Sequence, residues 1–142
     1  MARETGSVLS MSQTQQNSGR PLSPHLSVYK PQISSTLSIL HRATGVALAV
    51  GVLVLAWWLV AIAGGAEAYD QFMVCMSSIP GKLVLLGFTV ALNYHLLNGI
   101  RHLYWDTGRG FEIDSLHRTG WMVVIGTALL TVIEWALAYG MV

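Results

Sequence analysis

Three long runs without basic residues limit what this chain can fold into. They are residues 43–66, 83–100 and 119–142, and among them only the last contains an acidic residue, Glu134. A helix rises 1.5 Å per residue and needs about 20 mostly apolar residues to cross the hydrocarbon core of a bilayer. Each run is close to that length, so the sequence predicts an all-α integral membrane protein.

Composition agrees with this interpretation. The chain is 53% hydrophobic and 11% charged, whereas about a quarter of the residues in an average soluble domain are charged. The net charge of +1 argues against a nucleic-acid-binding protein. The single cysteine, Cys75, excludes an intramolecular disulfide framework and any CxxC motif.

We predict three transmembrane helices, at about residues 36–63, 81–105 and 119–140, in an up-down-up bundle. Residues that favour turns or helix starts lie between these segments. They are Gly64 and Gly65, Pro80 and Gly81, and Gly108 and Gly110.

The first 19 residues have a different composition, rich in Ser, Gln and Thr. They show no helical apolar period and no apolar core of the length that a signal peptide has. We therefore expect a flexible polar tail over residues 1–19 and a membrane-anchor domain over residues 20–142.

The basic residues predict an orientation. Four precede the first apolar run, one lies in the first loop and three flank the second loop: Arg3, Arg20, Lys30 and Arg42; Lys82; and Arg101, Arg109 and Arg118. The positive-inside rule then places the N-terminus and the second loop in the cytoplasm. With three spans, the C-terminus lies on the opposite side of the membrane.

The second span carries two histidines, His95 and His102, seven residues apart. Two helical turns separate them, so they lie on one face about 10 Å apart along the helix axis. Gly99, one turn from His95, leaves a notch on this face where a flat macrocycle could approach. The spacing is compatible with a haem, with Arg42 or Arg101 near its propionates, but also with an interhelical hydrogen bond and with basic residues that only anchor the helix ends.

Two longer segments resemble a known family. They are "RPLSPHLSVYKPQISSTLSILHRATG", residues 20–45, and "HLLNGIRHLYWDTG", residues 95–108. Both resemble signature segments of the cytochrome b subunit of succinate dehydrogenase, respiratory complex II, in its mitochondrial and alphaproteobacterial branch. The resemblance covers nearly the whole chain after residue 19.

The resemblance implies roles for five residues. His95 matches the axial ligand of the haem b iron. His41, His102 and Arg42 match residues around the haem propionates, and Ser38 with Arg42 matches the pair that contributes to the ubiquinone site. Ser38 and Arg42 are four residues apart and share a helical face, whereas His41 is turned about 100° from Arg42.

The resemblance also implies partners. The chain has no GxGxxG fingerprint and too few cysteines for an iron–sulfur cluster, so FAD and the clusters belong to a flavoprotein and an iron–sulfur subunit. A second small membrane subunit would supply the other haem ligand. We expect a non-autonomous subunit, without succinate-oxidising activity of its own, in a bacterial inner membrane rather than a mitochondrial one. The alternatives are a haem-free anchor and a subunit of a fumarate reductase or another quinone-linked dehydrogenase.

Overall fold

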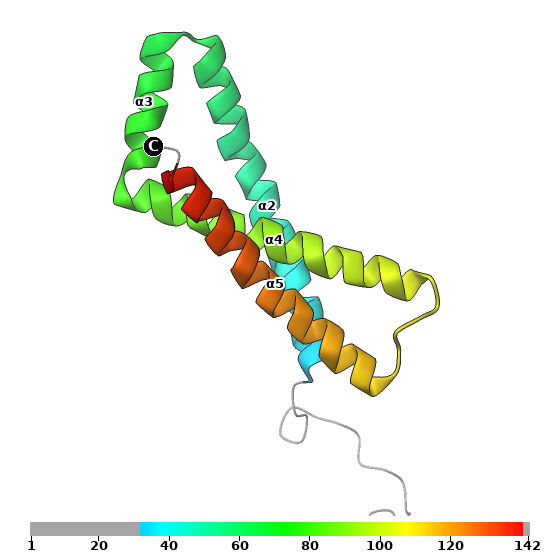
Figure 1. The fold of residues 1–142 in the computed structure, drawn as a ribbon. Coiled ribbons are helices and arrows are strands. Elements are labelled where there is room, and N and C mark those ends of the chain that lie inside the picture. Colours follow the sequence, from blue (N-terminus) through cyan, green and yellow to red (C-terminus); the bar gives the residue numbers. More distant parts are fainter. Residues whose placement is uncertain (1–31, 141–142) are drawn as a thin grey trace, which may run out of the picture. The chain divides into compact units, whose positions relative to one another are not determined.

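The computed structural model describes residues 32–140, and the predicted polar tail lies outside this range. Figure 1 shows its four helices, which are α2 (Ile33–Ala63), α3 (Ala66–Ser77), α4 (Ile79–Asp106) and α5 (Ile113–Gly140). Residues 32–140 contain no strand. α2, α4 and α5 are long and apolar enough to cross a membrane, which confirms the predicted all-α fold with three spans.

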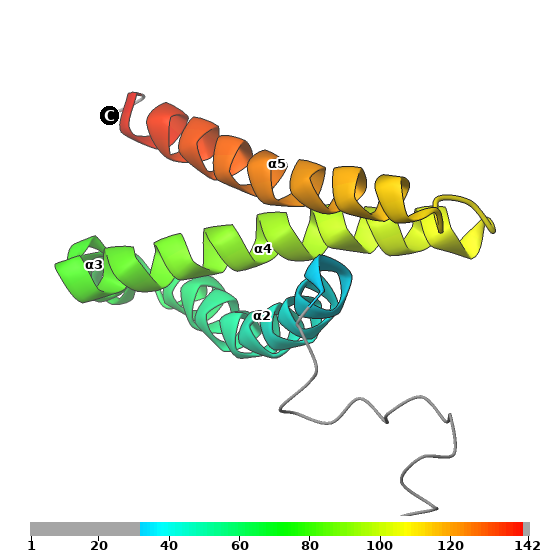
Figure 2. The same ribbon diagram turned by 90° about the horizontal axis from the view of Figure 1, so that it is seen from below.

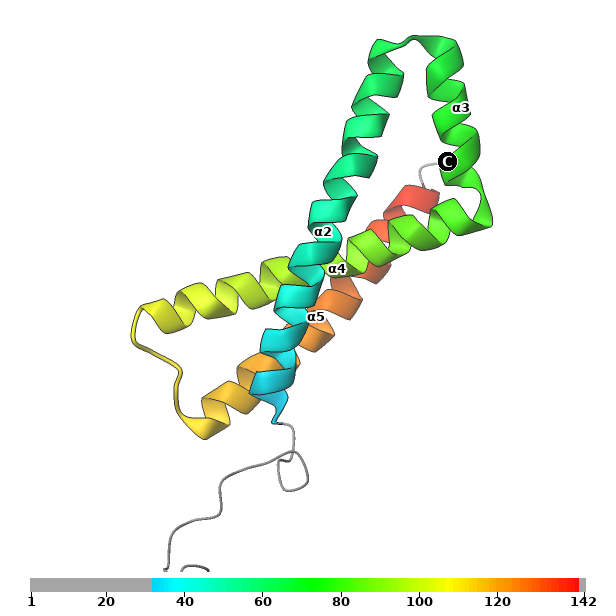
Figure 3. The same cartoon turned by 180° about the vertical axis from the view of Figure 1, so that it is seen from behind.

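The helix α3 was not predicted, because its 12 residues are too few to cross a bilayer and its composition is mixed. It is nevertheless amphipathic. Phe72 and Met76, one turn apart, are buried against Ala61 near the end of α2, and the Phe72 ring meets the Trp57 ring edge-on at 4.9 Å. α3 therefore runs back along α2 as a hairpin, which Figure 3 shows from behind.

The helix ends follow the turn-forming residues. Gly65, Gly108 and Gly110 have φ angles of 91°, 77° and 81°, a region that favours glycine. The Ser78 hydroxyl caps α4 by accepting a hydrogen bond from the amide of Gly81 at 3.2 Å. The last helix begins at residue 113, six residues earlier than predicted, because its polar first turns lack the apolar signal used to place its start.

The helix α4 lies between α2 and α5 (Figure 2); α5 runs antiparallel to it, whereas α2 crosses it steeply (Figure 1). At the start of α4 the Lys82 ammonium lies 5.8 Å from the ring centroid of Tyr139 near the end of α5. At the other end, Arg101 donates a hydrogen bond to Thr119 near the start of α5. Along α2, His41 lies against His95, whereas Gly51 lies against Phe88, nearer the start of α4. The three spans therefore run up, down and up.

Small residues let the helices approach closely. A Cβ atom placed on Gly51 of α2 would lie 2.9 Å from the Phe88 ring of α4, and one on Gly126 of α5 would lie 2.9 Å from Leu97 of α4. Such contacts are tighter than a methyl group allows. Glycine at these positions supports packing that rests on close backbone approach rather than on a large apolar core.

Polar side chains join α4 to α5 within the apolar spans. Asn93 is 3% exposed and donates hydrogen bonds to the Thr131 hydroxyl at 3.2 Å and to the Glu134 carboxyl at 2.8 Å. The indole of Trp135 donates to the Thr89 hydroxyl at 3.2 Å. Glu134 thus has an amide partner in the span, where an isolated ionisable group would be costly.

Most apolar side chains of the spans remain exposed. In the most apolar window of α2, only 6% of the residues are buried within the chain. In a membrane this apolar surface faces lipid or other polypeptides, because neither medium penalises it as water would.

Candidate functional site

Three histidine rings form a stack between α2 and α4. The ring centroids of His41 and His95 are 3.9 Å apart with planes at 10°, and those of His41 and His102 are 5.0 Å apart with planes at 20°. His41 of α2 therefore contacts both histidines of α4. These are the three histidines that the sequence selected.

Two glycines make room for this stack. A Cβ atom on Gly45 would lie 3.2 Å from Cε1 of His95, and one on Gly99 would lie 3.8 Å from Cε1 of His41. Each helix thus presents a residue without a side chain to an imidazole of the other. The notch at Gly99 faces the His41 ring in the structure of the chain alone.

The hydrogen bonds of His95 assign its tautomer. Nδ1 lies 3.1 Å from the backbone carbonyl oxygen of His41 and 3.2 Å from the hydroxyl of Thr44. A carbonyl oxygen only accepts hydrogen bonds, so we assign the proton to Nδ1. The Thr44 hydroxyl donates in turn to a carbonyl of its own helix, that of Leu40, at 2.9 Å. Nε2 then carries the lone pair, and no described residue hydrogen-bonds to it.

The other two imidazoles have different surroundings. Nδ1 of His102 lies 2.7 Å from the backbone carbonyl oxygen of Asn98 and therefore donates to it. Nδ1 of His41 is buried and has no hydrogen-bond partner among the described residues. Within residues 32–140, no three His, Cys, Asp or Glu side chains converge as metal ligands, because the imidazoles meet by their faces.

Ser38 and Arg42 lie one turn apart on α2, next to the histidine stack. Ser38 is partly buried and Arg42 is exposed. Neither side chain forms a hydrogen bond or ion pair with the residues that the structure describes. Their polar groups are therefore available to a ligand.

Arg101 is turned toward α5, although the sequence left it as an alternative cation near the propionates. It is 4% exposed and donates to the Thr119 hydroxyl and the Leu116 carbonyl, both at 3.1 Å. Its guanidinium also lies 4.1 Å from the ring centroid of Trp105. These contacts make Arg101 a link between α4 and α5, not an exposed anchor.

Sequence reasoning missed three polar residues that support the site. Thr44 contacts His95, and Tyr94 donates its hydroxyl proton to the Leu37 carbonyl at 2.6 Å. Asn98 is fully buried. Their polarity inside apolar runs was the available signal, since such groups need partners in a membrane.

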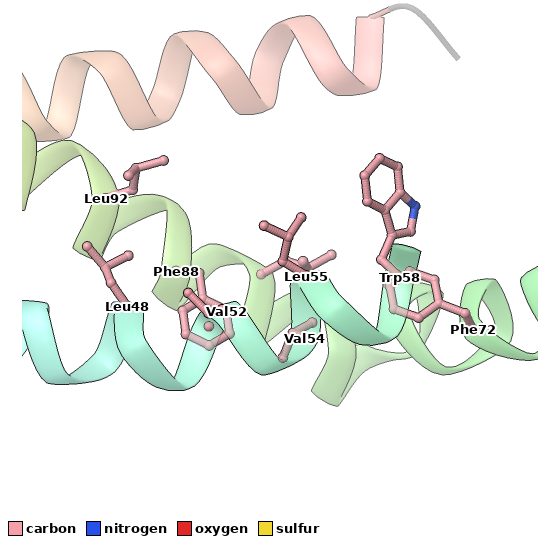
Figure 4. Close-up of a pocket in the computed structure, with 10 residues that line it drawn as sticks. Leu48, Val52, Val54, Leu55, Trp58, Phe72, Phe88 and Leu92 are labelled. Atoms are coloured by element: carbon pink, nitrogen blue, oxygen red, sulfur yellow. The ribbon is translucent and has the colours of Figure 1, made fainter. Parts of the chain in front are cut away.

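Cavities lie away from the histidine stack. One of about 580 Å³ lies between α2, α3 and α4 and is lined by apolar residues, among them Val54, Trp58, Phe72 and Phe88 (Figure 4). Another, of about 320 Å³, lies between α4 and α5 and includes Arg101 and Thr119 in its lining. The larger of these two cavities has no titratable side chain and no nucleophile in its lining.

Comparisons with known proteins identify the family of the chain. The family described as the succinate dehydrogenase/fumarate reductase transmembrane subunit matches residues 16–133. The succinate dehydrogenase cytochrome b556 subunit of Rickettsia prowazekii is 51% identical over 117 residues, which cover 82% of this chain and 90% of the relative. The subunit of the same name from Paracoccus denitrificans is 40% identical over 114 residues, which cover 80% of this chain and 88% of the relative.

A mitochondrial relative also matches. The succinate dehydrogenase cytochrome b560 subunit of Bos taurus is 38% identical over 115 residues, which cover 80% of this chain and 68% of the relative. The family match covers α2 and α4 completely and α5 as far as residue 133. The chain belongs to the family of succinate dehydrogenase/fumarate reductase transmembrane subunits.

Proposed function

We propose that this chain is the large membrane-anchor subunit of a succinate dehydrogenase, that it binds haem b, and that it helps to form the ubiquinone-reduction site. The observation that carries the proposal is the imidazole of His95, whose Nδ1 is held by the carbonyl of His41 while Nε2 is left with its lone pair. A carbonyl partner on the far nitrogen is the usual support of a metal-ligating histidine. The names of the relatives, which include cytochrome b, support the same cofactor.

The residues present fit a haem b with one axial ligand from this chain. His95 would ligate the iron through Nε2, and His41, His102 and Arg42 would lie around the propionates. When bound, the haem supplies one-electron transfer. Among residues 32–140, the buried Nδ1 of His41 has no hydrogen-bond partner. Because an unpaired buried nitrogen costs about 1–3 kcal/mol, this supports a bound polar group, such as a propionate, beside it.

The second axial ligand is proposed to come from another polypeptide. His102 lies on the same helix face as His95, and the His41 ring stacks on both. The backbone carbonyl of Asn98 holds Nδ1 of His102, and this chain would hold the iron through His95 alone. We infer a histidine of a second small membrane subunit. Held by two histidines, the haem would supply electron transfer rather than oxygen chemistry.

The quinone site is proposed at Ser38 and Arg42. The Ser38 hydroxyl would donate a hydrogen bond to a quinone carbonyl, and the Arg42 guanidinium would stabilise negative charge that develops there. Both side chains lack partners among residues 32–140, and both flank His41 in the same turns of α2. Because His41 stacks on His95, the proposed quinone and haem positions are adjacent.

The remaining subunits and the membrane complete the proposal. A flavoprotein with FAD would oxidise succinate, and an iron–sulfur subunit would pass electrons to the cytoplasmic edge of a bacterial inner membrane. The positive-inside rule places the start of α2 and the α4–α5 loop at that edge. The relatives reported above are named for succinate dehydrogenase, which favours succinate-to-ubiquinone turnover over fumarate reduction.

Purification of the complex in mild detergent tests the proposal. We expect three further polypeptides, a b-type absorption spectrum and succinate-to-ubiquinone turnover. A complete complex without a b-type spectrum would establish a haem-free anchor instead. Quinol-to-fumarate turnover well above the succinate-to-ubiquinone rate would establish the corresponding subunit of a fumarate reductase.

A further inference from the structure

Two consecutive residues of α4 donate hydrogen bonds to two backbone carbonyls of α2 that are one helical turn apart. The Tyr94 hydroxyl donates to the carbonyl of Leu37 at 2.6 Å, and Nδ1 of His95 donates to the carbonyl of His41 at 3.1 Å. Backbone atoms cannot change rotamer, so these bonds fix the helix axis itself and not only a side chain. Together they set both the height and the rotation of α2 against α4.

The bond from Tyr94 is buried and shared. Tyr94 is 7% exposed, Leu37 is 3% exposed and Asn98 is fully buried. The Asn98 amide also reaches the Leu37 carbonyl, at 3.5 Å, and its side-chain oxygen lies 3.5 Å from Nη1 of Arg101. Because these groups are buried from solvent, the short Tyr94 bond defines the position of this turn.

We propose that Tyr94 is a positioning residue for the quinone site and that it acts through its hydroxyl group. Leu37 immediately precedes Ser38, and its carbonyl also belongs to the turn that ends at His41. By holding this carbonyl, Tyr94 sets where the Ser38 hydroxyl lies relative to His95. The inference rests on the proposed quinone role of Ser38.

The test is Tyr94→Phe in the assembled complex, because this change removes one hydroxyl and keeps the ring. A small displacement of a substrate-binding group has a large effect on binding and rate. We expect the KM for a short-chain ubiquinone to rise about tenfold, with a smaller change in kcat. Affinity for a quinone-site inhibitor should fall in parallel, while haem content and succinate oxidation with an artificial acceptor are retained.

Two matched controls separate positioning from general loss of packing. Thr127 is also 7% exposed, but its hydroxyl donates to Val123 of its own helix, so Thr127→Val should leave the quinone KM unchanged. Asn93→Leu removes a buried amide of α4 that bonds to α5, whereas Asn98→Leu removes one that reaches α2. We expect only the second of these variants to raise the KM.

A double-mutant cycle tests whether Tyr94 acts through Ser38. If it does, Tyr94→Phe adds little to the defect of Ser38→Ala. Additive effects of the two changes on the KM would overturn the proposal. The proposal would also fail if the KM of the Tyr94→Phe complex were as low as that of the Thr127→Val control.

A second variant keeps the inference testable if the Tyr94→Phe complex fails to assemble. If Tyr94→Phe does not assemble, Asn98→Asp takes its place, because it keeps an acceptor for Arg101 but loses the amide donor to Leu37. An unchanged KM in that variant would overturn the inference.

If Ser38→Ala itself leaves ubiquinone reduction unchanged, the proposed quinone role of Ser38 fails, and the inference fails with it. If Ser38→Ala impairs ubiquinone reduction and Tyr94→Phe does not, the inference about Tyr94 fails while the proposed role of Ser38 stands.

Discussion

The imidazole of His41 lies face to face with that of His95, with ring centroids 3.9 Å apart and planes at 10°. This contact joins α2, which carries the proposed quinone-binding residues, to the proposed iron ligand on α4. The His41 carbonyl adds a hydrogen bond to the same imidazole at 3.1 Å. One residue therefore holds the His95 ring by its face and by its edge, and changes on either helix are expected to reach both sites.

Replacing His95 by Ala should remove or strongly alter the b-type spectrum, because the chain then lacks its proposed iron ligand. His102→Ala should act more mildly and shift the midpoint potential, because His102 has no proposed bond to iron. Optical redox titration of both purified complexes measures the b-type spectrum and the midpoint potential. A wild-type spectrum in the His95→Ala complex would remove His95 as ligand.

Arg42→Lys separates a quinone-binding role from a topological one. Lysine keeps the positive charge that orients the helix, but it lacks the planar fork of donors that the guanidinium presents. We expect intact assembly and a fall of about tenfold or more in ubiquinone reduction, by analogy with loss of one positioned donor. Wild-type turnover in this variant would mean that charge alone explains Arg42.

Thr44→Val should change the haem environment without removing the ligand. The hydroxyl lies 3.2 Å from Nδ1 of His95, and valine keeps the shape of the side chain but loses this partner. Partners of this kind typically contribute about 10- to 100-fold to metal affinity, so we expect faster haem loss in detergent and a shifted midpoint potential. Thr44→Ser retains the hydroxyl and should behave like the wild type. Equal haem retention in the Val and Ser variants would contradict the role.

Gly45→Leu should displace the His95 ring, since even a Cβ atom at residue 45 lies 3.2 Å from its Cε1. We expect reduced haem content, measured by the pyridine haemochrome assay. Gly87→Leu is the matched control, because a Cβ atom on Gly87 meets nothing within 4 Å. If both variants lose haem equally, general helix disruption explains the loss and not contact with His95.

The number, type and approximate limits of the membrane helices could be predicted from the order of the residues. A span must satisfy its own backbone hydrogen bonds in hydrocarbon, so a charge-free run of about 20 residues has few alternatives to a helix. Glycine and proline marked the ends, as Gly65 and Gly108 show by their φ angles. The helical period also placed His95 and His102 on one face, because that relationship lies within one helix.

Relationships between helices were decided only by tertiary packing. The sequence did not indicate that Arg101 turns toward α5, that Thr44 contacts His95, or that Tyr94 holds the Leu37 carbonyl. The short α3 was missed for a related reason, because it becomes recognisable through the burial of its apolar face against α2. The rotation of one apolar helix about its axis has little intrinsic preference in a membrane. It is set by where small residues permit close approach and where polar groups find partners, and both depend on the neighbouring helix.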